Sequence, residues 1–272
     1  SSSYPGQSEF AFVDMHMPVL NPSSVQEVLD YGIYGLELSR FSGCWVAMIT
    51  LTENMDSAAT VDVDSERVQI VRPANVEMPL GGLNIRLADS PLDQEERLWR
   101  YKRPAALAFC RENNLNKVLL DPPQASIGVV TTGKGHLDFM QALQNLEIDE
   151  EKATDLGIRV LKIGMTYPLD VAGIREFARG LEFLFVVEEK RSLIEVQLKE
   201  ELYNVEIVDP HFPKIVGKLD ALDQSLLPSY GELSPDIVAD VLTQLIPELS
   251  PEAVPPAPPE LQAIDVCEPE KN

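Results

Sequence analysis

Cysteine and histidine are scarce in this chain, which has three of each among 272 residues. The cysteines are Cys44, Cys110 and Cys267. They form no Cys-x-x-Cys pair and no Cys/His group, which excludes a zinc or iron–sulfur site of familiar spacing within this sequence. Scattered cysteines also favour a reducing compartment and therefore a cytoplasmic location. The histidines are not accompanied by a Gly-x-Ser-x-Gly elbow, so Ser/His hydrolysis has no support.

Basic charge is also in short supply. Lys and Arg number 22 against 44 acidic residues, for a formal net charge of -22. A charge of that sign repels phosphate backbones and anionic lipid surfaces, which argues against nucleic-acid and membrane partners. The excess charge serves solubility or, alternatively, attracts a basic partner. No apolar run reaches the length of about 18 residues that a transmembrane helix needs, and Ser1–Pro5 does not resemble a signal peptide.

What the chain does contain is enough apolar sequence for a core, with 44% hydrophobic and 24% charged residues. In the first segment, 1–72, the Ser23-Ser24 cap predicts a helix up to Arg40. The apolar run 44–51 predicts a strand buried on both faces, and 59–63 and 68–71 predict further strands. A helix followed by a strand is half of a β-α-β unit, and no preceding strand is visible. We therefore predict that 1–72 is the tail of an α/β domain.

A Pro- and Gly-rich stretch without periodicity, 73–89, predicts a linker. The second segment, 90–247, alternates helices with short apolar strands. We expect helices at 90–114, 135–146, from 149, 170–179, 192–202 and 234–245, and strands at 118–120, 126–131, 159–163, 183–187 and 215–216. This alternation predicts an α/β fold with a mostly parallel sheet and helices on both faces. Residues 248–272 form a Pro-rich acidic spacer. With no initiator Met at Ser1, the sequence reads as an interior excerpt.

In parallel sheets, ligands bind beyond the carboxyl ends of strands, near helix N-termini. One such end is the turn formed by Thr131, Thr132, Gly133 and Lys134. Its free N–H groups, hydroxyls and lysine cation could receive an anion. The turn lacks a nucleotide-binding glycine pattern, and the alternative is a plain strand-to-helix turn with Thr as the helix cap.

A second end carries Glu188, Glu189, Lys190 and Arg191 directly after a wholly apolar strand. Charges are costly there unless they are paired or hydrated. Either Glu188 or Glu189 contacts a ligand or a neighbouring domain, or the acids complement the dipole of the next helix. A third strand end could place Tyr167 at the same rim.

Several motifs, in this order, resemble one family. They are Ser-Ser-Ser-x-x-x-Gln-Ser-Glu (1–9), Asn-Pro-x-x-Val-Gln-Glu (21–27), Ser-Gly-Cys-Trp-Val (42–46), Gly-Gly-Leu-Asn-Ile-Arg (81–86), Gly-Val-Val-Thr-Thr-Gly-Lys (128–134), Val-Val-Glu-Glu-Lys-Arg (186–191), Gln-Leu-Lys-Glu-x-Leu-Tyr-Asn (197–204) and Gly-Glu-Leu-Ser-Pro (231–235). Together they resemble the indolepyruvate (2-oxoacid) ferredoxin oxidoreductases in their long fused form. The family usually carries His at the position of Gly6 or Gln7, where this sequence departs from it.

The resemblance implies that 1–72 ends a thiamine-diphosphate pyrimidine-type domain and that 90–247 is a transketolase C-terminal-like domain. It places Ser2 and Ser3 near the thiamine site, and makes the Thr131–Lys134 and Glu188–Lys190 turns surfaces that face other domains, with no catalytic residue in this chain. The parent enzyme would use thiamine diphosphate, Mg²⁺, [4Fe-4S] clusters and coenzyme A, with ferredoxin as electron acceptor. The catalytic glutamate would lie before Ser1, and the Mg²⁺/diphosphate domain and cluster cysteines after Asn272.

The leading hypothesis is thus an interior part of a 2-oxoacid:ferredoxin oxidoreductase that binds no cofactor by itself and forms a homodimer. One alternative is a non-catalytic domain for subunit assembly. Another is a piece of a transketolase or 2-oxoacid dehydrogenase type of thiamine enzyme without clusters.

Overall fold

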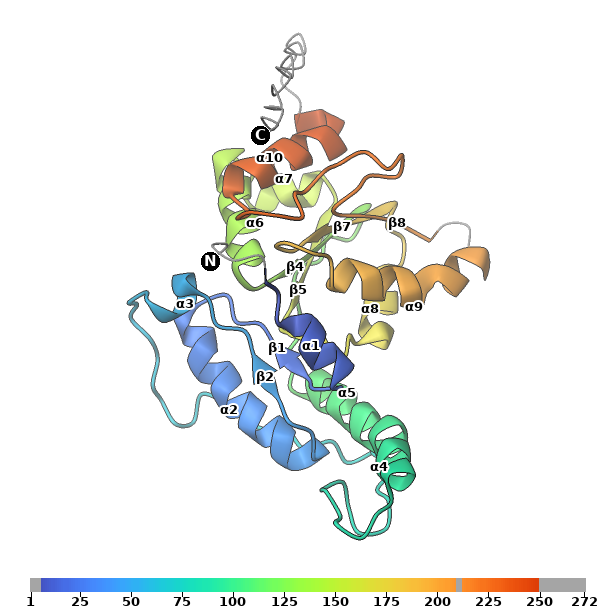
Figure 1. The fold of residues 1–272 in the computed structure, drawn as a ribbon. Coiled ribbons are helices and arrows are strands. Elements are labelled where there is room, and N and C mark those ends of the chain that lie inside the picture. Colours follow the sequence, from blue (N-terminus) through green and yellow to red (C-terminus); the bar gives the residue numbers. More distant parts are fainter. Residues whose placement is uncertain (1–5, 209–211, 250–272) are drawn as a thin grey trace, which may run out of the picture.

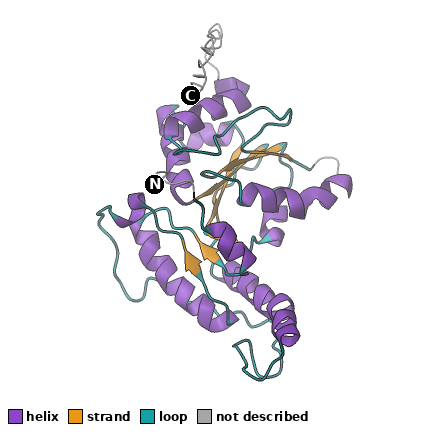
Figure 2. Ribbon diagram, viewed as in Figure 1, coloured by secondary structure: helices purple, strands orange, loops and turns teal. Residues whose placement is uncertain are grey.

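A computed structural model describes residues 6–208 and 212–249 and arranges them around two sheets (Figures 1 and 2). The larger sheet has the strand order β3-β5-β4-β7-β8 and the smaller one β2-β1-β6. The strands are β1 (Val19–Leu20), β2 (Ala47–Met48), β3 (Lys117–Leu120), β4 (Ile127–Thr132), β5 (Ile158–Ile163), β6 (Met165–Tyr167), β7 (Phe183–Val187) and β8 (Lys214–Val216). The helices are α1 (Glu9–Asp14), α2 (Val25–Ser42), α3 (Thr52–Met55), α4 (Pro91–Arg97), the π-helical η1 (Leu98–Lys102), α5 (Arg103–Glu112), α6 (Gly133–Asn145), α7 (Glu150–Asp155), α8 (Val171–Phe177), α9 (Ile194–Val208), α10 (Pro235–Leu245) and the 3₁₀ turn η2 (Pro247–Leu249).

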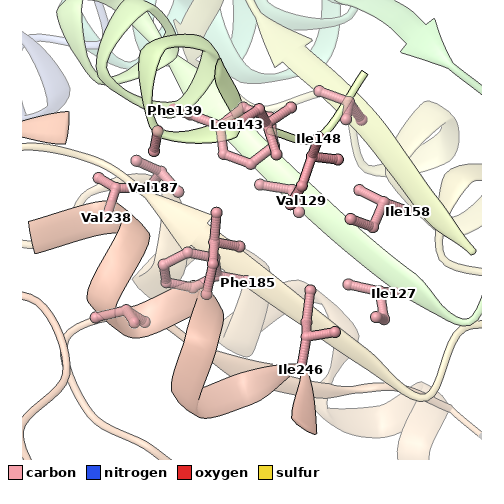
Figure 3. Close-up of a cluster of buried hydrophobic side chains, with 14 of the residues drawn as sticks. Ile127, Val129, Phe139, Leu143, Ile148, Ile158, Phe185, Val187, Val238 and Ile246 are labelled. Carbon is pink, nitrogen blue, oxygen red and sulfur yellow. The ribbon is translucent and has the colours of Figure 1, made fainter. Parts of the chain in front are cut away.

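The larger sheet is covered on both faces, and its central strands β4, β5 and β7 are largely buried. Side chains alternate along a strand, so β7 sends Phe185 and Val187 to one face and Leu184 and Val186 to the other. Helices α6, α7 and α10 cover the first face, where Phe185 packs with residues of α6 and α10 (Figure 3). Helices α8 and α9 cover the second. Strands β5, β4, β7 and β8 run parallel, which confirms the α/β fold with a mostly parallel sheet.

One edge of this sheet runs the other way. Strand β3 pairs antiparallel with β5, with a register shift between Val118 and Leu120. The expected strand is therefore present, but it is a short, largely exposed edge rather than part of the parallel core.

The smaller sheet contains the strand that is not visible in the sequence pattern. Val19 and Leu20 form β1, and β1 pairs in parallel with β2 across helix α2, so the β-α-β unit is complete. Sequence reasoning missed β1 because two residues between prolines and a loop give no periodic signal. The expectation of a missing strand is wrong.

Two other strand predictions fail in the same region. In the run 44–51, only Ala47–Met48 forms a strand, and this strand lies at the edge of its sheet. Trp45 is 73% exposed, so the run is not a strand buried on both faces. Neither 59–63 nor 68–71 forms a strand, and Val63 is 79% exposed. The reason is that no neighbouring strand is available to pair with them. The Asp62 and Asp64 carboxylates accept backbone N–H groups in turns, and the backbone of Val71 pairs with the Asn113 side-chain amide.

The two parts of the chain share structure. Strand β6, which follows β5 in the larger sheet, pairs antiparallel with β1 and so completes the smaller sheet. Helix α5 packs against α2 around Tyr31, Leu38 and Phe109. The Lys162 ammonium on β5 forms a buried ion pair with Glu27 on α2 and also donates to the Ser23 hydroxyl at 2.6 Å. Burial opposes ionisation of Glu27, yet this lysine holds the pKa of the carboxyl below its usual value.

Candidate functional site

A pocket of about 370 Å³ lies where the two sheets meet. Its walls come from the carboxyl ends of β1, β2, β4 and β7, through Asn21, 48–51, Thr132, 134–135 and 188–190. The start of α9 and residues 6–9 with Phe12 close the remaining sides. Strand ends of parallel units are where α/β proteins bind ligands, because helix N-termini present free N–H groups there.

The turn from β4 into α6 forms one wall. Gly133 has φ +49, and a Cβ atom there would lie 2.3 Å from the Asn21 Oδ1 atom, so only glycine fits. Thr132 occupies the N-cap position of α6, but its hydroxyl accepts no N–H group of the helix and donates to the Ile163 carbonyl at 2.9 Å. The alternative of Thr as the helix cap is therefore correct in position, but the side chain makes no capping hydrogen bond.

The Lys134 ammonium in this wall is bound by other groups of the same chain. It contacts both carboxylate oxygens of Asp138, at 2.9 and 3.1 Å, and donates to the Leu233 carbonyl at 2.6 Å. Burial by itself would lower the pKa of Lys134, but the ion pair with Asp138 raises it. The lysine remains charged and is largely neutralised locally.

Glu188 forms the opposite wall and is 4% exposed. Its carboxylate accepts the backbone N–H groups of Leu193, Ile194 and Glu195 at 2.9, 2.8 and 3.0 Å, and so caps the start of α9. Burial raises the pKa of this carboxyl against the opposing effect of those bonds. Of the two alternatives for Glu188, this geometry supports complementarity to the dipole of the helix that follows.

The next two residues extend the same turn. Glu189 Oε1 accepts the Leu233 N–H at 3.1 Å, and Lys190 has φ +54. Leu233 thus bonds to both walls, through its carbonyl to Lys134 and its N–H to Glu189. The loop before α10 ties the two turns together.

The structure brings most of the predicted site residues together. Thr132, Lys134, Glu188, Glu189 and Lys190 all line this pocket, and Gly133 lies against Asn21, which also lines it. Their roles toward a ligand stay predictions. Thr131 does not join them, because its hydroxyl pairs with His136 Nδ1 at 3.0 Å inside the protein. Ser2 and Ser3 lie outside the described residues.

Two amide side chains of the pocket were missed. The side-chain oxygens of Gln7 and Asn21 are both buried without a hydrogen-bond partner. Such an acceptor is destabilising unless something pairs with it. Asn21 follows directly on β1, so recognising β1 as a strand would have drawn attention to it.

Tyr167 does not reach this pocket. It lies in a small separate cavity with Cys44 and Trp99, where its hydroxyl bonds to His16 Nδ1 at 2.9 Å. Its neighbour Thr166 lines the main pocket instead. The prediction that Tyr167 shares the rim is wrong because side chains alternate along β6.

Within residues 6–208 and 212–249, no three His, Cys, Asp or Glu side chains are placed to hold a metal ion together. Cys44 and Cys110 are buried and unpaired. The described helices include none with the length and apolarity to cross a bilayer.

A parallel sheet whose strand ends meet a second sheet around a pocket defines an α/β protein of the kind that binds ligands at strand ends. Comparison with known proteins identifies a family within this class. Residues 117–255 match the model of the indolepyruvate oxidoreductase domain, which is slightly more than half of the chain. The chain belongs to the indolepyruvate oxidoreductase family, among the 2-oxoacid oxidoreductases.

Individual relatives agree. Indolepyruvate oxidoreductase subunit IorA of Methanothermobacter marburgensis is 29% identical over 224 residues, covering 82% of this chain and 33% of the relative. The subunit of the same name from Pyrococcus abyssi is 28% identical over 198 residues, covering 71% of this chain and 29% of the relative. The chain therefore spans about a third of the length of these curated relatives.

A solved structure is similar in fold. It is the 2-oxoglutarate:ferredoxin oxidoreductase from Magnetococcus marinus, with 2-oxoglutarate, coenzyme A and succinyl-CoA bound. The TM-score is 0.50 at 13% identity, over 85% of this chain and 42% of that one. At that identity the similarity concerns the fold.

Proposed function

We propose that this chain is part of a thiamine-diphosphate-dependent 2-oxoacid:ferredoxin oxidoreductase of the indolepyruvate type. The complete enzyme would decarboxylate a 2-oxoacid oxidatively, transfer the acyl group to coenzyme A and pass electrons to ferredoxin. Family membership supports the reaction class. The observation that carries a role for this chain is the pocket between the two sheets, walled by the ends of four strands.

The domain assignment belongs to the same proposal. Residues 1–72 correspond to the end of a pyrimidine-type domain, 73–89 to a linker, 90–247 to a transketolase C-terminal-like domain and 248–272 to a Pro-rich linker. The β1-α2-β2 unit supports the first assignment and the five-stranded sheet the third. Residues 250–272 lie outside the described part of the chain.

The chemistry of the pocket does not fit the diphosphate end of thiamine diphosphate. A diphosphate is bound by cations, by Mg²⁺ or by free N–H groups at a helix N-terminus. In this pocket Lys134 is already paired with Asp138, the N–H groups at the start of α9 are taken by Glu188, and the lining carboxylate of Glu189 would repel the anion. We therefore assign the diphosphate, Mg²⁺ and the iron–sulfur clusters to other parts of the parent enzyme, and derive no step through them.

What the pocket can contribute is shape and hydrogen bonding at the edge of a larger site. Phe12, Met48 and Leu193 give it apolar walls, and Gln7 and Asn21 offer unpaired amide oxygens. This chain by itself would then be inactive. The unpaired, buried thiols of Cys44 and Cys110 favour a reducing, cytoplasmic setting for the enzyme.

Calorimetry with thiamine diphosphate and Mg²⁺ tests the proposal. We expect no binding by residues 1–272 alone and binding by the complete enzyme. The complete enzyme should also reduce a viologen dye anaerobically when indolepyruvate and coenzyme A are supplied together. Tight binding by residues 1–272 alone would show that the cofactor site is here after all. A complete enzyme without 2-oxoacid-dependent reduction would refute the reaction.

A second candidate role is subunit assembly, including a homodimer. Apolar side chains project from the loop before α4, with Leu80 90% and Leu87 99% exposed. Exposed apolar groups in one place mark protein contacts. Sedimentation should show a smaller species for Leu80→Ser combined with Leu87→Ser, and no change for the neighbouring exposed Asn84→Ser. Identical sedimentation of both variants would remove this role from the loop.

A further inference from the structure

Residues 6–12 close one side of the pocket and bury little of their own surface. Residues 6–9 and Phe12 line the pocket, and α1 buries none of its six residues. Figure 1 draws α1 in front of the junction between the two sheets. Ser8 at the start of α1 makes no capping hydrogen bond with its side chain. A helix this short, without a buried face or a cap, gains its stability from contacts at its ends.

The C-terminal end of the segment is well fastened. Phe12, Val13 and Met17 pack beside Val19 and Tyr167 in an apolar cluster. Nearby, His16 bonds to Tyr167 and meets the Trp99 ring edge-on, with ring centroids 4.6 Å apart. This end can therefore act as a pivot.

Within the described part of the chain, the N-terminal end of the segment contacts Arg191, which directly follows the opposite wall. The Arg191 guanidinium lies 3.8 Å from the centroid of the Phe10 ring, and the Arg191 carbonyl accepts a hydrogen bond from Gln7 Nε2 at 3.0 Å. Arg191 is exposed, so its cation–π contact is weak and can be broken at little cost. Around Gly6, a Cβ atom would meet nothing within 4 Å, so the chain has room to move.

We propose that residues 6–11 form a lid over the pocket, pivoting at 12–17, and that Arg191 is the latch that holds it closed. Arg191 follows directly on Glu188, Glu189 and Lys190, which line the same pocket. A molecule that enters the pocket and displaces this turn also displaces the latch. The lid thus links occupancy of the pocket to its access, whatever reaction the complete enzyme performs.

Hydrogen exchange in the intact protein tests the latch. In Arg191→Ala, the amides of α1 should exchange about two- to fivefold faster, since one weak cation–π contact is lost. Arg179→Ala is the matched control, because Arg179 is likewise exposed and offers backbone hydrogen bonds, not side-chain ones, among the described residues. Phe10→Leu removes the ring without touching the turn, and should reproduce the effect of Arg191→Ala.

Access to the pocket is measured separately with a thiol probe. Thr166 lines the pocket and is 2% exposed, so Thr166→Cys places a thiol behind the lid. In a background with Cys267→Ser, this thiol should react with N-ethylmaleimide about two- to fivefold faster when Arg191→Ala is added, and at an unchanged rate with Arg179→Ala.

Equal rates for the Arg191 and Arg179 variants in both measurements would overturn the proposal. Faster exchange that extends over β7 and α9 would overturn it as well, because Arg191 would then stabilise the turn and not the lid. Faster exchange of α1 without faster labelling would show that α1 does not control access.

Discussion

The Glu188 side chain is buried, and both of its carboxylate oxygens accept hydrogen bonds. Its two oxygens accept three backbone N–H groups at the start of α9, and its own carbonyl accepts the Lys218 ammonium at 2.5 Å. Burial also lowers the pKa of Lys218. These contacts fix the shape of the turn, in which Glu189 and Lys190 line the pocket and Arg191 reaches Phe10 of the lid.

Glu188→Gln should therefore be destabilising. A glutamine keeps one acceptor oxygen but turns an N–H donor toward the helix N–H groups, which leaves at least one of them unpaired. We expect a loss of about 1–3 kcal/mol in the free energy of unfolding, measured by urea denaturation. The exposed Glu176→Gln is the control and should stay within about 0.5 kcal/mol of the unchanged protein. Equal stability of the two variants would contradict the capping role.

His136 makes stability depend on pH. Burial and the nearby Lys162 lower its pKa from 6.5 to about 4. In the unfolded chain His136 takes up its proton near pH 6.5, whereas in the folded chain it does so only near pH 4. The free energy of unfolding therefore decreases as the pH is lowered from 6.5 to 4. The full effect is about 3 kcal/mol.

His136→Asn keeps a polar group for Thr131 and removes this titration. Its free energy of unfolding should therefore fall less steeply than that of the unchanged protein between pH 6.5 and 4. Urea denaturation at four or five pH values measures both slopes, and the carboxylates common to the two proteins cancel in the difference. Parallel slopes would show that His136 titrates normally.

At the scale of elements, the turn between β4 and α6 depends on its contact with the end of β1. Gly133 faces Asn21 across that contact. Gly133 follows β4 of the larger sheet and Asn21 follows β1 of the smaller one, so the fit couples the first part of the chain to the second.

Gly133→Ala should lose about 1–3 kcal/mol from the left-handed φ, and more from the clash with Asn21. In the double variant, Asn21→Ala should remove the clash and restore the stability that it costs. The loss of stability from the left-handed φ should remain. A double-mutant cycle of urea denaturation curves measures this coupling. Additive effects of the two substitutions would show that the residues do not meet.

For the molecule as a whole, the two sheets are joined by β6, by packing of α5 on α2 and by the buried Glu27–Lys162 pair. A buried pair of this kind is strongly destabilising when one partner is lost. Neither part can unfold without exposing the core of the other.

We therefore expect one cooperative unfolding transition. Trp45 and Trp99 both lie in the first hundred residues, so their fluorescence reports that part, while far-ultraviolet circular dichroism reports all helices. The two urea curves should coincide. A fluorescence transition at lower urea would show that the first part unfolds independently.

The long helices and the central strands of the larger sheet were predictable from sequence. Their periodicity is local, as in α6 and in the apolar run of β7, and capping residues such as Ser24, Ser90 and Ser234 mark where helices begin. The turns at Thr132–Lys134 and Glu188–Lys190 followed from the same reasoning, because strand ends carry the site in such folds.

Pairing across long distances was not predictable. Strand β1 has two residues and exists because β2 and β6 flank it, whereas 59–63 has suitable residues but no neighbour. Likewise, the roles of Gln7, Asn21 and Arg191 depend on contacts with residues far away in the chain. The sequence by itself determined the family, the α/β class and the strand ends, since these rest on local periodicity and motifs. Only the tertiary structure decided which of those ends share a pocket and what covers it, because both depend on how two sheets pack.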